Sequence, residues 1–321
     1  MRIHILHEND AWLPPFGAAL DAEGLPWEAW HLDGGALALD AEPPQGVFWS
    51  RMSASSHARG HEHAKEHGRT VLSWLEGHGR TVVNGRRALD LEVSKAAQHA
   101  ALRSAGIDVP RTVAVVGDLA RVRDAARSLA APFITKVNQG GKGLGVRRFE
   151  SHEALDAAVG ATLEGGPGGS ADGALEVPVD GVLLLQELLV AATPEITRVE
   201  VVGGEFVYAI TVGTGGGFEL CPADACAVDE MAAPGITPPT FRLRSDLTAD
   251  DAAPWVGFAR RFGLGVAGFE FIDTVDGRRV TYDINTNTNY NPDVERAASL
   301  PAATAVARYL GRLLAAEAAS S

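Results

Sequence analysis

Two carboxylates and an amide in the segment GFEFIDTVDGRRVTYDIN stand at a spacing that suits metal binding. Glu270 lies in one apolar run, a turn is expected at the Asp-Gly pair, and Asp283 and Asn285 lie in the returning run. The pattern predicts a β-hairpin with Glu270 facing Asp283, and with Asn285 on the same side as Asp283. Facing carboxylates repel each other without a cation, and a few hard oxygen ligands suit Mg²⁺. We expect a magnesium site here, with a solvated hairpin edge as the alternative.

Asparagines continue at every second position after this hairpin, at Asn287, Asn289 and Asn291. If the segment stays extended, these amides form one polar row with Asp283, because side chains two residues apart point the same way. Asparagine is a poor strand former, and an exposed strand seldom contains so many of them. The row therefore weakens the solvated-edge interpretation.

A glycine-rich loop, TKVNQGGKGLGV, joins two further strand-like runs. Its glycines would let backbone amides approach phosphate oxygens, and Lys136 and Lys142 would supply positive charge. The loop lies between two strands, whereas a P-loop and a dinucleotide-binding fingerprint both open a helix. A surface turn without a ligand is the alternative interpretation.

Together these segments resemble the ATP-grasp superfamily, and within it the branch of glutathione synthetase and the RimK-type glutamate ligases. The resemblance covers nearly the whole chain and rests on VSKAAQHAALRSAGIDVPRT, FITKVNQGGKGLGV, LLLQELL and ITRVEVVGG. It implies metal ligation by Glu270, Asp283 and Asn285, and it points Arg198 into the active site. Arg242 and Arg244 are further candidates for phosphate or acyl-phosphate contacts, or else surface cations. The residues implied for nucleotide binding are Lys95, Lys136, Gly140, Gly141, Lys142, Gly143, Gln186, Glu187, Leu188, Leu189 and Glu195.

The resemblance also implies a chemistry. The cofactors would be ATP and two Mg²⁺ ions, with Mn²⁺ as an alternative metal. A substrate carboxylate would attack the γ-phosphorus of ATP, and an amine would capture the resulting acyl phosphate. The substrates would be small molecules, amino acids or short peptides. A small-molecule kinase and a non-catalytic nucleotide-binding regulatory protein are the competing functions. The family's second metal carboxylate is usually glutamate, whereas here it is Asp283. The family also has a turn that contains proline and glycine after the asparagine ligand, and TNTNYNP stands in its place here. The substrate of the family members therefore cannot be assigned to this chain.

Side chains near the N-terminus are candidates for substrate binding. The segment SRMSASSHARGH follows a strand-like run, where ligand sites of open α/β sheets lie. We expect substrate contacts from it and from two of the later amides, with a helix N-cap at Ser55 or Ser56 as the competing role. The residues are Arg51, Ser53, Ser55, Arg59, Asn287 and Asn289. Histidine pairs four residues apart follow, at 57 and 61 and at 63 and 67, but we expect a solvated helix face rather than a zinc site.

The elements that must position these residues form three units in a mixed α/β and α+β chain. Residues 1–87 alternate as an open α/β unit; residues 88–187 give a linking helix and a central subdomain with the glycine hairpin; residues 188–321 give a C-terminal subdomain with the metal site. The resemblance implies a three-part ATP-grasp architecture in which the two α+β units would clasp ATP. The segment EGGPGGSADG is expected to be a flexible insertion or disordered loop.

Composition narrows the partners and the location. The net charge of −13 argues against a nucleic-acid partner, which would need concentrated cations. No apolar run is long enough to cross a bilayer, and the first residues lack the features of a signal peptide. The two cysteines, Cys221 and Cys226, do not suggest a disulfide framework, so a cytoplasmic setting is expected. The apolar N-terminal unit could support a homo-oligomer.

Overall fold

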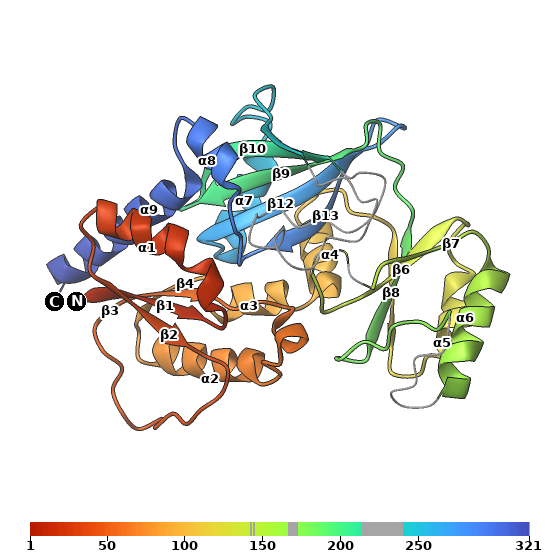
Figure 1. The fold of residues 1–321 in the computed structure, drawn as a ribbon, viewed down its shortest axis with the longest axis horizontal. Coiled ribbons are helices and arrows are strands. Elements are labelled where there is room, and N and C mark those ends of the chain that lie inside the picture. The colour runs from red at the N-terminus through yellow and green to blue at the C-terminus, as the bar shows by residue number, and fades with distance from the viewer. Residues whose placement is uncertain (142, 144, 166–172, 214–239, 321) are drawn as a thin grey trace.

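The structure is a computed structural model that describes residues 1–141, 143, 145–165, 173–213 and 240–320. The expectations about Lys142, Cys221 and Cys226 lie outside the described residues, as does most of the predicted insertion. The described residues form three sheets, each with its own helices (Figure 1).

The first sheet is parallel, with strand order β2-β1-β3-β4. Its apolar strands are buried on both faces, because α2 packs with Leu6 and Phe48 on one side and α1 packs with Ile3 and Ile5 on the other. The carboxyl ends of the first three strands carry His7, His31 and Arg51 side by side. The elements are β1 (Arg2–His7), η1 (Asp10–Trp12), α1 (Pro14–Ala22), β2 (Trp27–His31), β3 (Gly46–Arg51), η2 (Ser56–Arg59), α2 (Ala64–Gly77) and β4 (Thr81–Val83).

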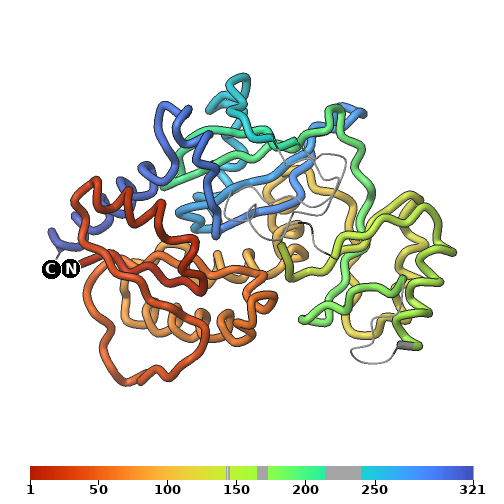
Figure 2. Tube along the Cα trace, viewed as in Figure 1, coloured from red at the N-terminus to blue at the C-terminus, as the bar shows by residue number. Residues whose placement is uncertain are grey.

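Two linking helices lead to a second, antiparallel sheet with order β5-β8-β6-β7. Helices α5 and α6 cover one face of this sheet and close a separate apolar core with Phe133 and Leu185. Figure 2 shows this unit projecting away from the rest of the chain. The elements are α3 (Arg86–Glu92), α4 (Lys95–Ser104), β5 (Thr112–Val116), α5 (Arg121–Ala126), β6 (Phe133–Val137), β7 (Arg147–Phe149), α6 (His152–Gly165) and β8 (Val182–Glu187).

The third sheet is antiparallel, with order β11-β10-β9-β12-β13. A hairpin turn at Gly203 and Gly204, both with positive φ, joins β9 to β10. Helix α7 covers one face with Trp255 and Phe258. The elements are β9 (Glu195–Val202), β10 (Glu205–Gly213), β11 (Phe241–Leu243), α7 (Ala253–Phe262), β12 (Val266–Asp273), β13 (Arg279–Asn285), α8 (Pro292–Ala297) and α9 (Ala302–Ser320).

The first and third sheets share one apolar core. Helix α9 returns to pack against α1 and the first sheet, so its Val306 and Leu310 join Trp49 and Val266 in a single cluster. The predicted fold class, an open α/β unit followed by two α+β units, is confirmed. The predicted boundaries at residues 87/88 and 187/188 stay predictions.

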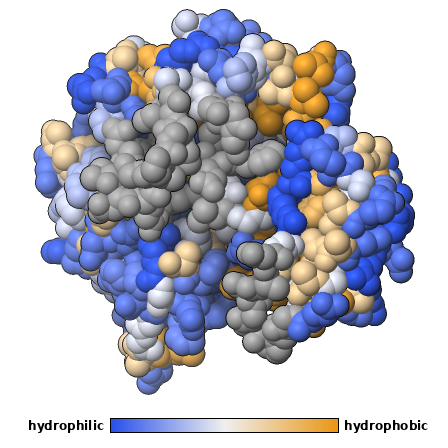
Figure 3. Space-filling model, turned by 45° about the vertical axis from the view of Figure 1, so that its right-hand side comes forward, coloured by the Kyte–Doolittle hydropathy of each residue, from blue (hydrophilic) through white to orange (hydrophobic). Residues whose placement is uncertain are grey.

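Among the described residues drawn in Figure 3, hydrophilic side chains cover much of the face, with apolar areas between them. No helix among the described residues is long and apolar enough to span a membrane.

Candidate active site

The three predicted metal-ligating residues converge on one face of the third sheet. Glu270 on β12 lies directly opposite Asp283 on β13, and Gly268 lies opposite Asn285. The Asn285 Nδ2 donates a hydrogen bond of 3.1 Å to Glu270 Oε1. Burial, and then the nearby Asp283 charge, raise the pKa of the Glu270 carboxyl. The hairpin thus gathers two carboxylates and an amide on one face, and carboxylate and amide oxygens are ligands that Mg²⁺ prefers.

A β-bulge adds a side chain that the sequence pattern does not reveal. Glu270 pairs with Asp283 but Phe271 pairs with Thr281, so Tyr282 is the extra residue between them. Its hydroxyl donates a 2.9 Å hydrogen bond to Glu270 Oε2. Burial, followed by the charge of Glu270, raises the pKa of Tyr282 well above its usual value, which keeps the hydroxyl a donor. Strict alternation would place Tyr282 away from Asp283, so the hydrophobic pattern gives no sign of it.

Arg198 extends the row onto a third strand. Arg198 is on β9, opposite Glu270 of β12. Its side chain is 1% exposed, and its Nε lies 2.6 Å from Glu200 Oε1. Its Nη1 lies 3.9 Å from Glu270 Oε1, while Nη2 is buried without a hydrogen-bond partner among the described residues. The guanidinium passes over Gly268, where an added Cβ would lie 2.5 Å from Nε. The glycine therefore makes room for the arginine.

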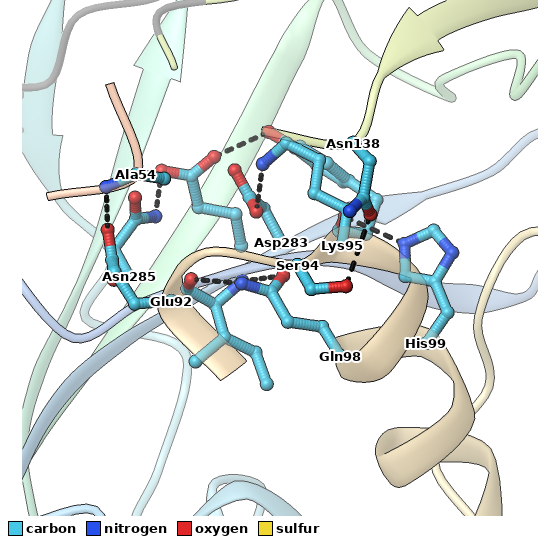
Figure 4. A network of polar contacts seen from close by, with 12 residues as sticks. Ala54, Glu92, Ser94, Lys95, Gln98, His99, Asn138, Asp283 and Asn285 are labelled. Carbon is cyan, nitrogen blue, oxygen red and sulfur yellow. Dashed lines mark hydrogen bonds and ion pairs between the residues drawn. The ribbon is translucent and has the colours of Figure 1, made fainter. Parts of the chain in front are cut away.

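Two lysines from other parts of the chain reach the same carboxylates. Lys95, at the start of α4, donates a 2.6 Å hydrogen bond from Nζ to Asp283 Oδ1 (Figure 4). Lys136 on β6 is 6% exposed and makes no hydrogen bond or ion pair with the described part of the chain. Burial, and then the positive charge of Lys95, lower the pKa of the Lys136 ammonium to about 7, although Asp283 and Glu270 oppose this shift. An anion arriving here would raise that pKa again.

The face of the second sheet opposite α5 and α6 turns toward these groups. Phe133 and Leu185 point to α5 and α6, so their alternating neighbours Lys136 and Gln186 point the other way. Gln186 is 4% exposed, and its Oε1 has no hydrogen-bond partner among the described residues. Such a buried acceptor fits a ligand with an amino group.

The rest of the predicted hinge segment follows β8. The Glu187 carboxylate accepts a 2.9 Å hydrogen bond from the Arg111 backbone N–H and pairs with Arg278 at 3.3 Å. Leu188 and Leu189 come directly after the strand and are half-buried. Their nucleotide contacts stay predictions.

The glycine loop rests on the linking helix and on the first unit. Asn138 Oδ1 accepts a 2.9 Å hydrogen bond from the Ala96 N–H at the start of α4. Lys65 on α2 donates to Gln139 Oε1, and an added Cβ on Gly141 would lie 3.6 Å from Ser55 Oγ. Gly143, next along the loop, has a φ of 74°. Gly140 is close-packed too, because an added Cβ would lie 2.9 Å from Val137 Cγ2. Sequence reasoning missed Asn138, whose only signal is its place between a strand and the glycines.

Two predicted arginines do not join the carboxylate cluster. Arg242 on β11 is 61% exposed and pairs with Glu195 at 2.7 and 2.9 Å. Arg244 pairs with Asp273 at 2.9 Å and donates to Thr197 Oγ1. Thr197 alternates with Arg198, so both arginines lie toward the α7 face of the sheet. Their contacts with phosphate, and that of Glu195 with nucleotide, stay predictions that this arrangement does not favour.

The candidate substrate residues of the first unit form a buried network. Arg51 is 1% exposed and donates to Trp12 O at 2.8 Å, Thr288 O at 2.9 Å and Asn289 Oδ1 at 2.8 Å. Its guanidinium therefore positions the segment that follows Asn285. These contacts leave the substrate roles of Arg51 and Asn289 as predictions.

Arg59 and two serines form a second part of this network. Arg59 pairs with the fully buried Glu8, a residue that sequence reasoning missed, and donates to Ser55 Oγ at 3.2 Å. Ser53 Oγ lies 3.1 Å from Ser55 Oγ. The predicted N-cap bond of Ser55 is not made, because no helix N–H donates to its hydroxyl.

The predicted row of amides is only partly present. The strand ends at Asn285, although burial goes on alternating through residue 290 with the asparagines half-buried and the residues between them buried. Asn287 has a buried Oδ1 without a partner among the described residues. Asn291 leaves the row, because its Oδ1 accepts hydrogen bonds of 2.9 and 3.1 Å from the first N–H groups of α8. That capping role is visible in the sequence as an asparagine before proline.

Comparisons with known proteins address the fold. No protein-family model matches the chain, and no curated protein does. The solved structure of the ATP-grasp ligase PsnB, complexed with a minimal precursor, Mg and ADP, is 18% identical with a TM-score of 0.63, covering 97% of this chain and 96% of PsnB. A RimK domain ATP-grasp protein from Sphaerobacter thermophilus is 17% identical with a TM-score of 0.65, over 96% and 99% of the two chains. The D-cycloserine synthetase DcsG is 17% identical with a TM-score of 0.64, over 97% and 99%.

These likenesses extend over nearly the full length of each chain, so they include all three units and their order. The chain therefore has the ATP-grasp fold, as its motifs predict. At such identities the comparisons speak for the fold alone, and the activity must be argued from the residues of this chain.

Proposed function

We propose that this protein is an ATP-dependent carboxylate–amine ligase that works through an acyl phosphate. The observation that carries the proposal is the row of Arg198, Glu270 and Asp283 across three neighbouring strands, with Lys95 bonded to its far end. Two adjacent carboxylates with a cation at each end, largely shielded from water, suit a metal-assisted reaction in which negative charge is transferred.

The residues present fit a magnesium–nucleotide complex. Glu270, Asp283 and Asn285 offer oxygen ligands, and Mg²⁺ bound there would neutralise phosphate charge. The unpartnered Gln186 Oε1 on the facing sheet offers an acceptor to an amino group such as that of adenine. Arg198 Nη2, also unpartnered, offers a donor to a phosphoryl or carboxylate oxygen. Each of these free buried atoms would gain a partner on binding.

The proposed reaction has two steps. A substrate carboxylate oxygen attacks the γ-phosphorus, and the bond to the ADP oxygen breaks. An amine nitrogen then attacks the acyl carbon, phosphate leaves, and the nitrogen loses a proton. Lys136, protonated once phosphate is near, and Arg198 would hold the transferring group in place. The glycine loop, anchored by Asn138, would limit the access of water to the acyl phosphate.

For the substrates we propose a chemical class and not a particular compound. By their printed titles, PsnB is complexed with a precursor peptide and DcsG is a D-cycloserine synthetase, so related folds accept peptides and small molecules. We propose a small-molecule or peptide carboxylate with an amine acceptor, in the cytoplasm where ATP is supplied. Asn287, with its free Oδ1, is the described amide best placed to meet such a substrate.

A substrate screen tests this proposal. Phosphate release from ATP and Mg²⁺ is measured with a panel of amino acids, other carboxylic acids and peptides, each with and without hydroxylamine. A particular acid that stimulates release and yields a hydroxamate would support ligation. A stable phosphorylated product that forms without an amine would instead favour a kinase. Asp283→Asn, which keeps the side-chain shape, is the control for contaminating ATPases.

A further inference from the structure

Two histidines and an aspartate meet at the carboxyl edge of the first sheet, on residues that the proposed ligase chemistry does not use. His7 ends β1 and His31 ends β2, and the two are direct partners in the parallel register. Asp10 opens η1 immediately after β1. Its Oδ1 lies 3.3 Å from His31 Nδ1 and 3.7 Å from His7 Nδ1, and the three ligand atoms lie within 4.8 Å of one another.

Hydrogen bonding within the chain leaves part of this cluster unexplained. The His7 side chain is 3% exposed, and its buried Nδ1 has no hydrogen-bond partner among the described residues. A buried polar atom of this kind costs stability unless something binds it. Burial, and then the neighbouring His31, lower the pKa of His7, while Asp10 opposes the shift. The Nδ1 atom, 3.7 Å from Asp10 Oδ1 and without a hydrogen-bond partner among the described residues, is therefore placed to bind a metal ion.

We propose that His7, Asp10 and His31 bind one divalent transition-metal ion of the zinc type. Zinc bonds of about 2.0–2.2 Å in a tetrahedron place neighbouring ligand atoms about 3.3–3.5 Å apart, which is close to the two measured separations. Imidazole nitrogen with one carboxylate suits Zn²⁺, whereas Mg²⁺ prefers oxygen ligands alone. Three protein ligands leave a fourth position open to water.

A second group shares His31 and competes with this assignment. His31, Asp33 and His61 also lie within 4.8 Å of one another. His61, however, hydrogen bonds through Nδ1 to the buried Glu8 at 2.9 Å, and its group lacks a buried, unpartnered nitrogen. The His7 group has one, so it is the better site. The histidine spacing along residues 57–67 did not reveal this arrangement, because the ligands end two strands and open a 3-10 helix.

The ion would stabilise the part of the first unit that contacts the candidate active site. It would tie the ends of β1 and β2 to η1, whose Trp12 carbonyl accepts a hydrogen bond from Arg51. Arg51 in turn holds Asn289 and the segment after the magnesium ligands. Occupancy would therefore stabilise the first unit against the third sheet.

The test is zinc calorimetry on untagged, chelator-treated protein, with excess Mg²⁺ and ADP present to fill the ATP site. We expect one Zn²⁺ per chain, and on Co²⁺ substitution a visible absorption band of a four-coordinate ion. Asp10→Asn and His31→Gln should each weaken zinc affinity by more than about 100-fold, since even outer partners of metal sites contribute about 10- to 100-fold. Asp10 is 80% exposed, so its variant should fold.

Matched controls separate the alternatives. His63→Gln changes an exposed histidine outside the cluster, and His61→Gln removes a ligand of the competing group together with its hydrogen bond to Glu8. Both should bind zinc like the wild type. The proposal is overturned if the wild type binds no stoichiometric zinc, if Asp10→Asn and His31→Gln bind normally, or if His61→Gln weakens binding as much as they do.

Discussion

Gly268→Ala is the sharpest test of the role of Arg198. The added Cβ would lie 2.5 Å from Nε, 2.9 Å from Nη2 and 3.0 Å from Cζ of the guanidinium. To restore normal contact the guanidinium must move by about 1 Å. Glu200 at 2.6 Å and Glu270 at 3.9 Å hold it on either side, so the move breaks the row of charges.

The expected result is a large loss of turnover with a moderate loss of stability. A displacement of about 1 Å in a positioning group costs on the order of 100-fold in rate, and overpacking a tight site costs about 1–3 kcal/mol. Steady-state phosphate release with the stimulating acid measures the first, and urea unfolding measures the second.

The control is Gly257→Ala in the exposed part of α7, where an added Cβ meets nothing within 4 Å. It should leave turnover unchanged and raise stability by up to about 1 kcal/mol, the difference in helix propensity. If Gly268→Ala turned over at the wild-type rate, the reasoning that places Arg198 at the reacting groups would be refuted.

Three other predictions follow. Because Lys136 has a pKa of about 7 without ligand, nucleotide binding at pH 8 should take up nearly one proton. Calorimetry in buffers of different ionisation enthalpy measures this proton uptake. Equal uptake by Lys136→Met would contradict the prediction. Asp283→Asn should fold but lose Mg²⁺-dependent phosphate release, and wild-type release would rule out the metal assignment. Asn84 has a φ of 55°, and its side-chain amide donates hydrogen bonds to Val266 O at 2.8 Å and Thr286 O at 2.9 Å. Asn84→Gly tolerates the positive φ but removes these bonds, so the free energy of unfolding in urea should fall by about 3 kcal/mol or more. A loss under about 1 kcal/mol would show that the bonds are dispensable.

Periodicity predicted the elements well because each has a clear apolar face. The hairpin carrying Glu270 and Asp283 pairs in the expected register, since its Asp-Gly turn and alternating residues leave few alternatives. The three-part order of units could likewise be inferred from the strand and helix pattern, and the ATP-grasp resemblance is confirmed at the level of fold.

What escaped prediction depends on contacts between distant parts of the chain. Tyr282 reaches Glu270 because of a bulge, which local pattern cannot show. The family motif singled out Arg198, and Arg242 was a further candidate with a surface cation as the alternative; the strand register places the two on opposite faces of the sheet. Asn84 and Glu8 are buried by segments up to two hundred residues away, so no window along the chain could mark them.

The most direct test of the proposed function follows oxygen from the substrate acid. The acid that stimulates phosphate release is labelled with ¹⁸O in its carboxylate, and the released phosphate is analysed by mass spectrometry. An acyl phosphate requires that one carboxylate oxygen leaves with phosphorus, so one ¹⁸O should appear in phosphate for each amide formed. Phosphate without the label, at full amide yield, would contradict the mechanism.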